Sequence, residues 1–196
     1  MKTLIIEPYF TGSHKQWADS YKRHSSHNIK ILSLKGQFWK WRMHGGAITL
    51  AKMFNAMDWL PDLIFATDML DLNTFLSLTR NKSNGIPTAI YFHENQLSYP
   101  WSPSDRDRKN KRDSHHGFIN YSSALAADKV FFNSEFHMKS FLNALNPFLK
   151  QFPDYQELDT INVIKEKSEV LFLGLDLNPF RKHKLIKDSR PNILWN

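Results

Sequence analysis

Short apolar runs alternate with segments of helical spacing along most of this chain, and this alternation constrains its fold more than any other feature. The runs are rich in β-branched and aromatic residues and predict strands. These strands are predicted at residues 3–8, 29–34, 62–67, 87–93, 129–133 and 169–173. The segments between them predict helices at 14–24, 46–57, 71–80, 113–127 and 135–150, with N-cap candidates at Ser13, Asp71 and Ser134.

Strands that are apolar throughout and alternate with helices favour a parallel sheet covered on both faces. The predicted fold class is therefore α/β, a doubly wound parallel sheet of the Rossmann-like kind, formed by residues 1–178. From residue 179 the chain becomes polar and charged, and the apolar run "NILWN" begins only at its end. Residues 179–196 are therefore predicted to be a linker and the first strand of a further, C-terminal domain that the chain does not contain.

Composition narrows the class of protein. An apolar share of 41%, with 14% aromatic residues, is enough for a core and argues against global disorder. No apolar stretch approaches the roughly 18 residues of a spanning helix, so no membrane segment is predicted. The absence of cysteine excludes disulfides and thiolate metal sites and fits a reducing compartment, so we expect a cytoplasmic protein. A net charge of +7 favours polyanionic partners such as nucleic acid or phosphorylated ligands.

Polar residues follow most of the predicted strands. In open parallel sheets, ligands bind beyond the carboxyl ends of the strands. Those ends carry Thr11–His14, Thr67–Asp68, His93–Asn95, Asn133–Glu135 and residues 174–176. We expect these clusters to meet at one edge of the sheet and to form the functional site there.

The stretch "YFTGSHKQ" lies at the first predicted strand-to-helix turn. Gly12 allows close approach of the backbone to a ligand, and free N–H groups at the following helix start suit an anion, with Lys15 nearby. The spacing matches neither the dinucleotide fingerprint nor a P-loop, so an ordinary glycine turn capped by Ser13 is the alternative. Gly45 and Gly46 are expected to precede another helix and to add N–H groups to the same pocket.

His93 and Glu94 follow the fourth predicted strand. Neighbouring strand residues point to opposite sides, so the two are a poor acid–base couple with each other. His93 can donate to a sugar hydroxyl or stabilise charge, and Glu94 can bind a hydroxyl; the alternative for His93 is a purely structural hydrogen bond. A metal site built from His93, His115 and His116 lacks the usual ligand spacings, and a serine hydrolase lacks its G-x-S-x-G turn.

Two stretches combine cations with aromatic residues. The run "SDRDRKNKRDSHH" at 104–116 can bind phosphates of a large acceptor, with Tyr99 and Trp101 stacking on a base or sugar. Its alternative is a solvated loop, and the aromatic residues can equally belong to the core. "FWKWRMHGG" at 38–46 poses the same choice, and it is too polar for a helix interior and too aromatic for a plain linker.

The motifs "EPYFTGSHKQW" and "FHENQLSYP", with "LGLDL" followed by a linker and "ILWN", resemble the N-terminal domain of the tRNA-queuosine α-mannosyltransferase family. The resemblance covers essentially the whole chain. It implies a retaining glycosyltransferase of the GT-B type, with two Rossmann-like domains facing each other across a cleft. It also implies transfer of mannose from GDP-mannose to queuosine in tRNA, without a metal or cofactor, the sugar nucleotide being a substrate.

The resemblance, read together with the strand-end positions and the two basic aromatic stretches, gives the predicted sites. The predicted catalytic residues are His93 and Glu94. The predicted donor-binding residues are Gly12, Ser13, His14, Asn95, Gln96, Asn133 and Ser134. The predicted acceptor-binding residues are Lys15, Tyr99, Trp101, Arg106, Arg108, Lys109, Lys111 and Arg112.

Because the chain stops where the second domain would begin, we expect this polypeptide alone to bind GDP-mannose weakly or not at all and to transfer no sugar. The expected partners are tRNA, a sugar nucleotide and the missing C-terminal domain. Two alternatives stay open: a non-catalytic RNA-binding module of the same fold, and a GT-B enzyme with another acceptor. A sugar-nucleotide epimerase or dehydrogenase would instead be expected to carry a G-x-G-x-x-G turn.

Overall fold

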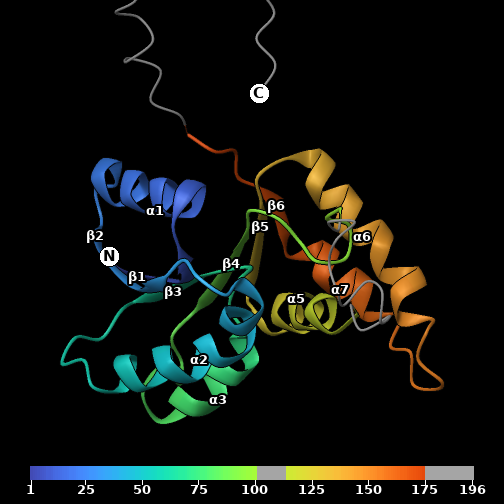
Figure 1. Cartoon of the computed structure of the whole chain (residues 1–196), viewed down its shortest axis with the longest axis horizontal. Coiled ribbons are helices and arrows are strands. Elements are labelled where there is room, and N and C mark those ends of the chain that lie inside the picture. Colours follow the sequence, from blue (N-terminus) through green and yellow to red (C-terminus); the bar gives the residue numbers. More distant parts are fainter. Residues whose placement is uncertain (101–113, 175–196) are drawn as a thin grey trace, which may run out of the picture.

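A computed structural model describes residues 1–100 and 114–174 of the chain. Its elements, in chain order, are β1 (Lys2–Phe10), α1 (Gly12–His24), β2 (Asn28–Lys35), α2 (Trp39–Asn55), β3 (Leu63–Thr67), α3 (Leu72–Ser83), β4 (Thr88–Phe92), α5 (Ser114–Ala126), β5 (Lys129–Phe132), α6 (Glu135–Leu149), α7 (Thr160–Glu166) and β6 (Ser168–Val170). The strands form one six-stranded sheet in the order β2-β1-β3-β4-β5-β6, as Figure 1 shows. Every pair is parallel. The predicted Rossmann-like α/β class is confirmed.

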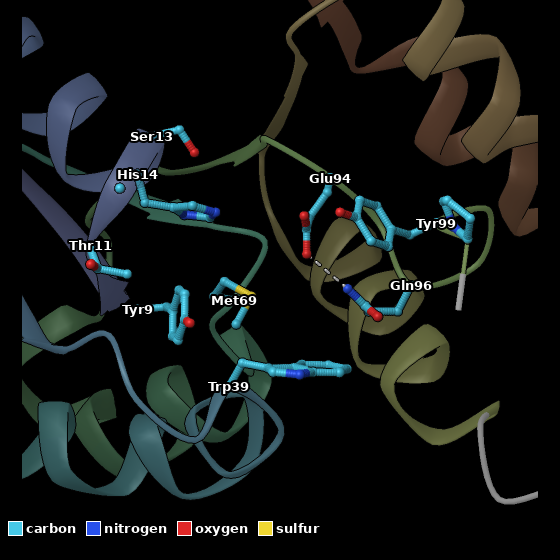
Figure 2. Close-up of a pocket in the computed structure, with 11 residues that line it drawn as sticks. Tyr9, Thr11, Ser13, His14, Trp39, Met69, Glu94, Gln96 and Tyr99 are labelled. Carbon is cyan, nitrogen blue, oxygen red and sulfur yellow. Dashed lines mark hydrogen bonds between the residues drawn. The ribbon is translucent and has the colours of Figure 1, made fainter. Parts of the chain in front are cut away.

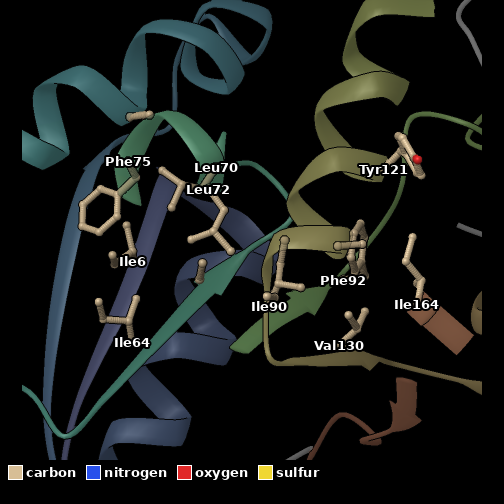
Figure 3. Packing of buried hydrophobic residues seen from close by; sticks show 14 of the residues in the cluster. Ile6, Ile64, Leu70, Leu72, Phe75, Ile90, Phe92, Tyr121, Val130 and Ile164 are labelled. Atoms are coloured by element: carbon tan, nitrogen blue, oxygen red, sulfur yellow. The ribbon is translucent and has the colours of Figure 1, made fainter. Parts of the chain in front are cut away.

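The sheet is covered on both faces because side chains alternate along each strand. Leu4 and Ile6 of β1 join a large core with α2, α3, α5, α6 and α7 on one face, part of which Figure 3 shows. Ile5 points to the other face, where α1 packs through Ala18 and Trp17. Figure 1 shows α1 on one side of the sheet and α2 and α3 on the other. In the sheet, β2 lies on one side of β1 and β3 lies on the other, so the strand order reverses at β1. Such a switch point opens a crevice at the carboxyl ends of the strands.

All six predicted strands are confirmed within two or three residues at each end, and the five predicted helices are present. The predicted start of the second helix at residue 46 is wrong, because α2 begins at Trp39. Gly45 and Gly46 therefore lie buried inside a helix and do not provide N–H groups to a pocket. A Cβ on Gly46 would lie 3.3 Å from Cβ of Pro8, so this glycine allows α2 to approach β1 closely. The helix α7 was not predicted.

Two of the three predicted N-caps are confirmed. The side chain of Asp71 accepts a hydrogen bond from the Thr74 N–H, and that of Ser134 accepts one from the His137 N–H. The prediction for Ser13 is wrong: α1 begins at Gly12, its N-cap position is Thr11, and no side chain caps it. The first N–H groups of α1 are thus left without a side-chain acceptor.

Residues 101–113 and 175–196 lie outside the described part of the chain. The predicted linker at 179–196 and most of the basic run at 104–116 fall there and stay predictions. Within the described residues, no helix is both long and apolar enough to cross a membrane.

Candidate active site

A cavity of about 560 Å³ opens at the carboxyl edge of the sheet, where β1, β3 and β4 end. Figure 2 shows side chains from the β1–α1 turn on one side and from the segment after β4 on the other. The lining residues are Tyr9, Thr11, Gly12, Ser13, His14, Trp39, Met69, Glu94, Gln96, Tyr99 and Pro100. Among them are six of the predicted site residues, so the clusters after β1 and β4 meet as expected. Asp68 and Asn133, from the clusters after β3 and β5, contact the backbone of His93 instead of the cavity, Gly174 lines a different cavity, and residues 175–176 lie outside the described residues.

The segment after β4 is held by buried polar side chains of its neighbours. The backbone N–H of His93 donates to Asp68 Oδ1 at 2.8 Å, and Asn133 Nδ2 donates to the His93 carbonyl at 2.8 Å. The Gln96 N–H donates to Asn120 Oδ1 at 2.7 Å, and Asn120 Nδ2 in turn donates to the Asp68 carbonyl. These bonds satisfy peptide groups that have left the sheet, and they fix the position of the cavity wall.

Glu7 and His14 form a buried pair behind the cavity. Glu7 lies within β1 and is fully buried; its Oε1 accepts the Tyr9 N–H, and its Oε2 lies 2.9 Å from Nδ1 of His14. A buried carboxylate needs a partner that offsets its lost hydration, and the His14 ring supplies it. Figure 2 shows the ring of His14 directed into the cavity. Its Nε2 makes no hydrogen bond with any described residue.

The charges around His14 determine its protonation. Burial alone would lower the pKa of His14, but the hydrogen bond and charge of Glu7, helped by Asp68 and Glu94, raise that pKa to about 9. Burial raises the pKa of Asp68 to about 7, although the charge of His14 opposes this. His14 is therefore an imidazolium at neutral pH, and its Nε2–H is a charged donor at the cavity wall.

His93 lies beside His14 but does not line the cavity. Its ring centroid is 4.3 Å from that of His14 and 4.8 Å from the Trp17 and Tyr91 rings. Burial, together with the charges of His14 and His137, lowers the pKa of His93 to about 2, so this ring is neutral. Its buried Nε2 has no hydrogen-bond partner among the described residues.

Glu94 and Gln96 form the opposite wall. The Gln96 amide donates to Glu94 Oε1 at 3.2 Å, and both side chains line the cavity with Tyr99 (Figure 2). Burial raises the pKa of Glu94, while His14 and Gln96 pull it in the opposite direction. A carboxyl group that faces a cavity and has a raised pKa suits acid–base chemistry or binding of a sugar hydroxyl.

The other predicted site residues have local partners in this structure. Asn95 accepts the N–H groups of Leu97 and Ser98 and thereby shapes its own turn. Ser134 caps α6, and Lys15 pairs with Asp19 on the outside of α1. Six further predicted acceptor residues lie outside the described residues: Trp101, Arg106, Arg108, Lys109, Lys111 and Arg112.

Sequence reasoning missed several residues of the site. Glu7 is the clearest case, because a carboxylate inside the apolar run "TLIIEPY" is itself a signal of a buried partner. Trp39 lies in the stretch 38–46, which the sequence left open between binding and core, and it was not named as a site residue because α2 was predicted to begin only at residue 46. Met69 follows β3 and carries no chemical signal in the sequence.

The described residues contain one set of three possible metal ligands, Glu7, His14 and His93, whose ligand atoms lie within 4.8 Å of one another. Two of these three, Glu7 and His14, already lie within hydrogen-bond distance of each other, with Oε2 and Nδ1 2.9 Å apart. The trio of His93, His115 and His116 is not assembled in the described part of the chain. Instead His115 stacks on His44 with ring centroids 4.3 Å apart, and His116 contacts Trp39 at 5.2 Å.

Comparison with known proteins identifies the family. The family model described as tRNA-queuosine alpha-mannosyltransferase N-terminal matches residues 2–175. The chain belongs to this family. A curated tRNA-queuosine alpha-mannosyltransferase from Drosophila melanogaster is 36% identical over 178 residues. The match covers 90% of this chain and 45% of that relative, so the chain spans less than half the length of the Drosophila protein.

The matched residues of the tRNA-queuosine alpha-mannosyltransferase N-terminal family include all of the cavity lining and the buried Glu7–His14 pair. The resemblance inferred from "EPYFTGSHKQW" and "FHENQLSYP" is confirmed. The catalytic, donor-binding and acceptor-binding roles of the individual residues stay predictions.

Proposed function

We propose that this domain belongs to a two-domain GT-B glycosyltransferase that transfers mannose from GDP-mannose to queuosine in tRNA, with retention of configuration. The observation that carries the proposal is the 36% identity to a tRNA-queuosine alpha-mannosyltransferase across 90% of the chain. Since the chain spans 45% of that relative, the second domain and most of the nucleotide site would lie in the remainder of a longer protein. A tRNA acceptor and the lack of cysteine both support the expected cytoplasmic location.

The cavity chemistry supports a reaction in which negative charge develops on a leaving diphosphate. The charged Nε2–H of His14 faces the cavity, and α1 directs its uncapped N-terminus to the same place. Charged donors and helix N-termini stabilise such charge when they are fixed in advance. This account uses the residues of the chain and requires no metal ion or cofactor.

The sugar itself would meet the opposite wall. We assign Glu94 to a hydroxyl of the donor sugar or to proton transfer, because its carboxyl lines the cavity and has a raised pKa. His93 is neutral and has a buried Nε2 without a partner among the described residues, so a small rearrangement would let it donate to a sugar hydroxyl. Both assignments keep the predicted catalytic pair.

The direct test is transfer by the full-length protein. Queuosine-containing tRNA and GDP-mannose are incubated with it, the tRNA is digested to nucleosides, and these are analysed by mass spectrometry. We expect queuosine to gain the mass of one hexose, and other sugar nucleotides serve as controls. Unchanged queuosine, under conditions in which the Drosophila enzyme modifies it, would refute the proposal.

The non-catalytic RNA-binding module remains the second candidate, favoured by the net charge of +7. The His93→Ala variant of the full-length protein separates the two. An enzyme loses turnover while it keeps affinity for tRNA, whereas a binding module shows no turnover in either form. Calorimetry on the 196-residue chain adds a check, because micromolar binding of GDP-mannose would contradict our expectation that this chain alone binds it poorly.

A further inference from the structure

The positive charge of the chain is concentrated in one stretch. Residues 20–57 contain seven Lys and Arg residues and no Asp or Glu. The whole chain has 26 basic and 19 acidic residues, so the rest of the chain is balanced and this stretch carries the net charge of +7. These cations are spread over α1, β2 and α2, but Lys35, Lys40 and Arg42 lie between the end of β2 and the first turn of α2, where they favour a polyanionic partner.

At the carboxyl edge of the sheet, this stretch presents large aromatic side chains to solvent. Phe38 is 75% exposed and Trp41 is 62% exposed, next to Lys40 and Arg42. Phe38 is the N-cap residue of α2 and Trp41 lies in its first turn, so the two exposed rings flank the start of this helix, where Lys40 and Arg42 are half-buried. We call Lys35, Phe38, Lys40, Trp41 and Arg42 the α2 rim patch.

The α2 rim patch is held in a defined conformation. Phe38 has a left-handed backbone with φ of 53°, which is uncommon for a bulky residue and marks stored strain. The Trp41 indole lies against Gly45, where an added Cβ would be 2.5 Å from Cζ2 of the ring. Arg42 Nε donates to the Lys35 carbonyl at 3.1 Å, which ties the end of β2 to the first turn of α2. Aromatic surfaces fixed in this way lose little entropy when a ligand stacks on them.

The patch adjoins the candidate active site. Trp39 lies between Phe38 and Lys40 in the chain and lines the cavity, and Lys40 Nζ lies 5.4 Å from its ring centroid. A ligand bound on the patch would therefore have its reacting part within reach of the cavity. An acceptor must be held in this way, with its body on a docking surface and its reacting group in the active site.

We propose that the α2 rim patch docks the unpaired loop of an RNA acceptor, with Phe38 and Trp41 stacking on bases and Lys35, Lys40 and Arg42 contacting phosphates. Single-stranded RNA is recognised by stacking of splayed bases on aromatic residues together with cations along the backbone. An acidic protein partner would satisfy the charge but gives no reason for two exposed rings beside the cavity. The inference rests on the proposed function, since it names the surface by which the acceptor is held.

The test measures fluorescence anisotropy of a labelled RNA stem-loop with an unpaired loop, and of a fully paired duplex of the same composition, with the 196-residue chain. Loss of one stacked base weakens binding about 5- to 150-fold, which is the change expected for Trp41→Ala and Phe38→Ala on the stem-loop. Tyr155→Ala is the matched control, because Tyr155 is 88% exposed but lies between Asp154 and Glu157. We expect its binding to equal that of the wild type.

Gly45→Ala provides a sharper variant, because it displaces the Trp41 indole without removing it and adds a better helix former. We expect weaker RNA binding with equal or higher thermal stability, which separates misplacement of the ring from misfolding. For Lys40→Gln and Arg42→Gln, each lost phosphate contact lowers the slope of log affinity against log salt by about 0.7.

Wild-type affinity of Trp41→Ala and Phe38→Ala for the stem-loop would overturn the inference, and so would equal binding of the duplex. The binding assay contains no sugar donor, so its outcome is independent of transfer. If the patch variants lose RNA binding but the full-length protein transfers no mannose, the inference stands and the proposed function fails. If transfer proceeds with unchanged KM for tRNA in the patch variants, the proposed function stands and the inference fails.

Discussion

At the scale of single residues, the pair of Glu7 and His14 determines the charge of the cavity wall. Glu7 is fully buried in β1, and its two oxygens are used by the Tyr9 N–H and the His14 ring. A carboxylate in that position orients the imidazole and keeps it protonated, so that its other nitrogen faces the ligand space as a donor. The neighbouring His93 ring is neutral because burial, and after it the positive charge of His14, lowers its pKa.

We expect Glu7→Gln to lower the pKa of His14 clearly below about 9, since burial is then opposed only by the smaller effects of Asp68 and Glu94. Titration of the His14 ring signals by NMR measures this change. Asp19→Asn removes a carboxylate from an exposed pair with Lys15 on the same helix and serves as the control. A wild-type His14 that titrates near 6.5, or bound zinc in place of the proton, would contradict the assignment.

The raised pKa of His14 also predicts how stability depends on pH. Because the pKa is higher in the folded state than the ordinary 6.5, the stabilisation is complete below about pH 6.5 and is lost as the pH rises through about 9. We expect the free energy of unfolding in urea to fall by about 3 kcal/mol across this range. In His14→Asn this part of the pH dependence should vanish. If the free energy of unfolding fell equally steeply with pH in both proteins, another group would cause the pH dependence.

At the scale of elements, the helix starts at the carboxyl edge differ in how they are capped. Ser134 Oγ accepts the His137 N–H, so Ser134→Ala should lower the free energy of unfolding by about 1 kcal/mol. Ser13 caps nothing, and Ser13→Ala should change stability by less than about 0.5 kcal/mol. Thermal or urea unfolding of both variants measures the difference. Equal losses would mean that Ser13 caps α1 in solution.

The same elements show how far the sequence predicts this structure. The central strands β3 and β4 were predictable because each is a nearly continuous apolar run, and buried parallel strands leave that pattern clearly. The start of α2 was not predictable. The stretch "FWKWRMHGG" has aromatic residues both at the cavity and on the exposed side of the helix, and it contains two glycines, which usually interrupt a helix. Tertiary packing favours glycine there in spite of that local preference, since a Cβ on Gly46 would lie 3.3 Å from Cβ of Pro8.

At the scale of the whole molecule, the order β2-β1-β3-β4-β5-β6 brings distant motifs together. The parallel topology made it predictable that the "TGSH" and "HEN" motifs would share one edge of the sheet. Which side chains face the cavity was not predictable, because this depends on side-chain packing: the sequence favoured His93, but the structure directs His14 into the cavity and places His93 behind it. The uneven charge, by contrast, is visible in the sequence once acidic residues are located as well as counted.

The central claim is that sugar transfer takes place in the cavity whose charged wall is His14. The measurement that tests it most directly is the turnover of queuosine-containing tRNA with GDP-mannose by the full-length His14→Asn variant, compared with wild type and Asp19→Asn. Removing a fixed donor to developing negative charge costs about 100-fold or more in kcat, and we expect a loss of that size with Asp19→Asn unaffected. A folded His14→Asn enzyme that keeps wild-type turnover would contradict the claim.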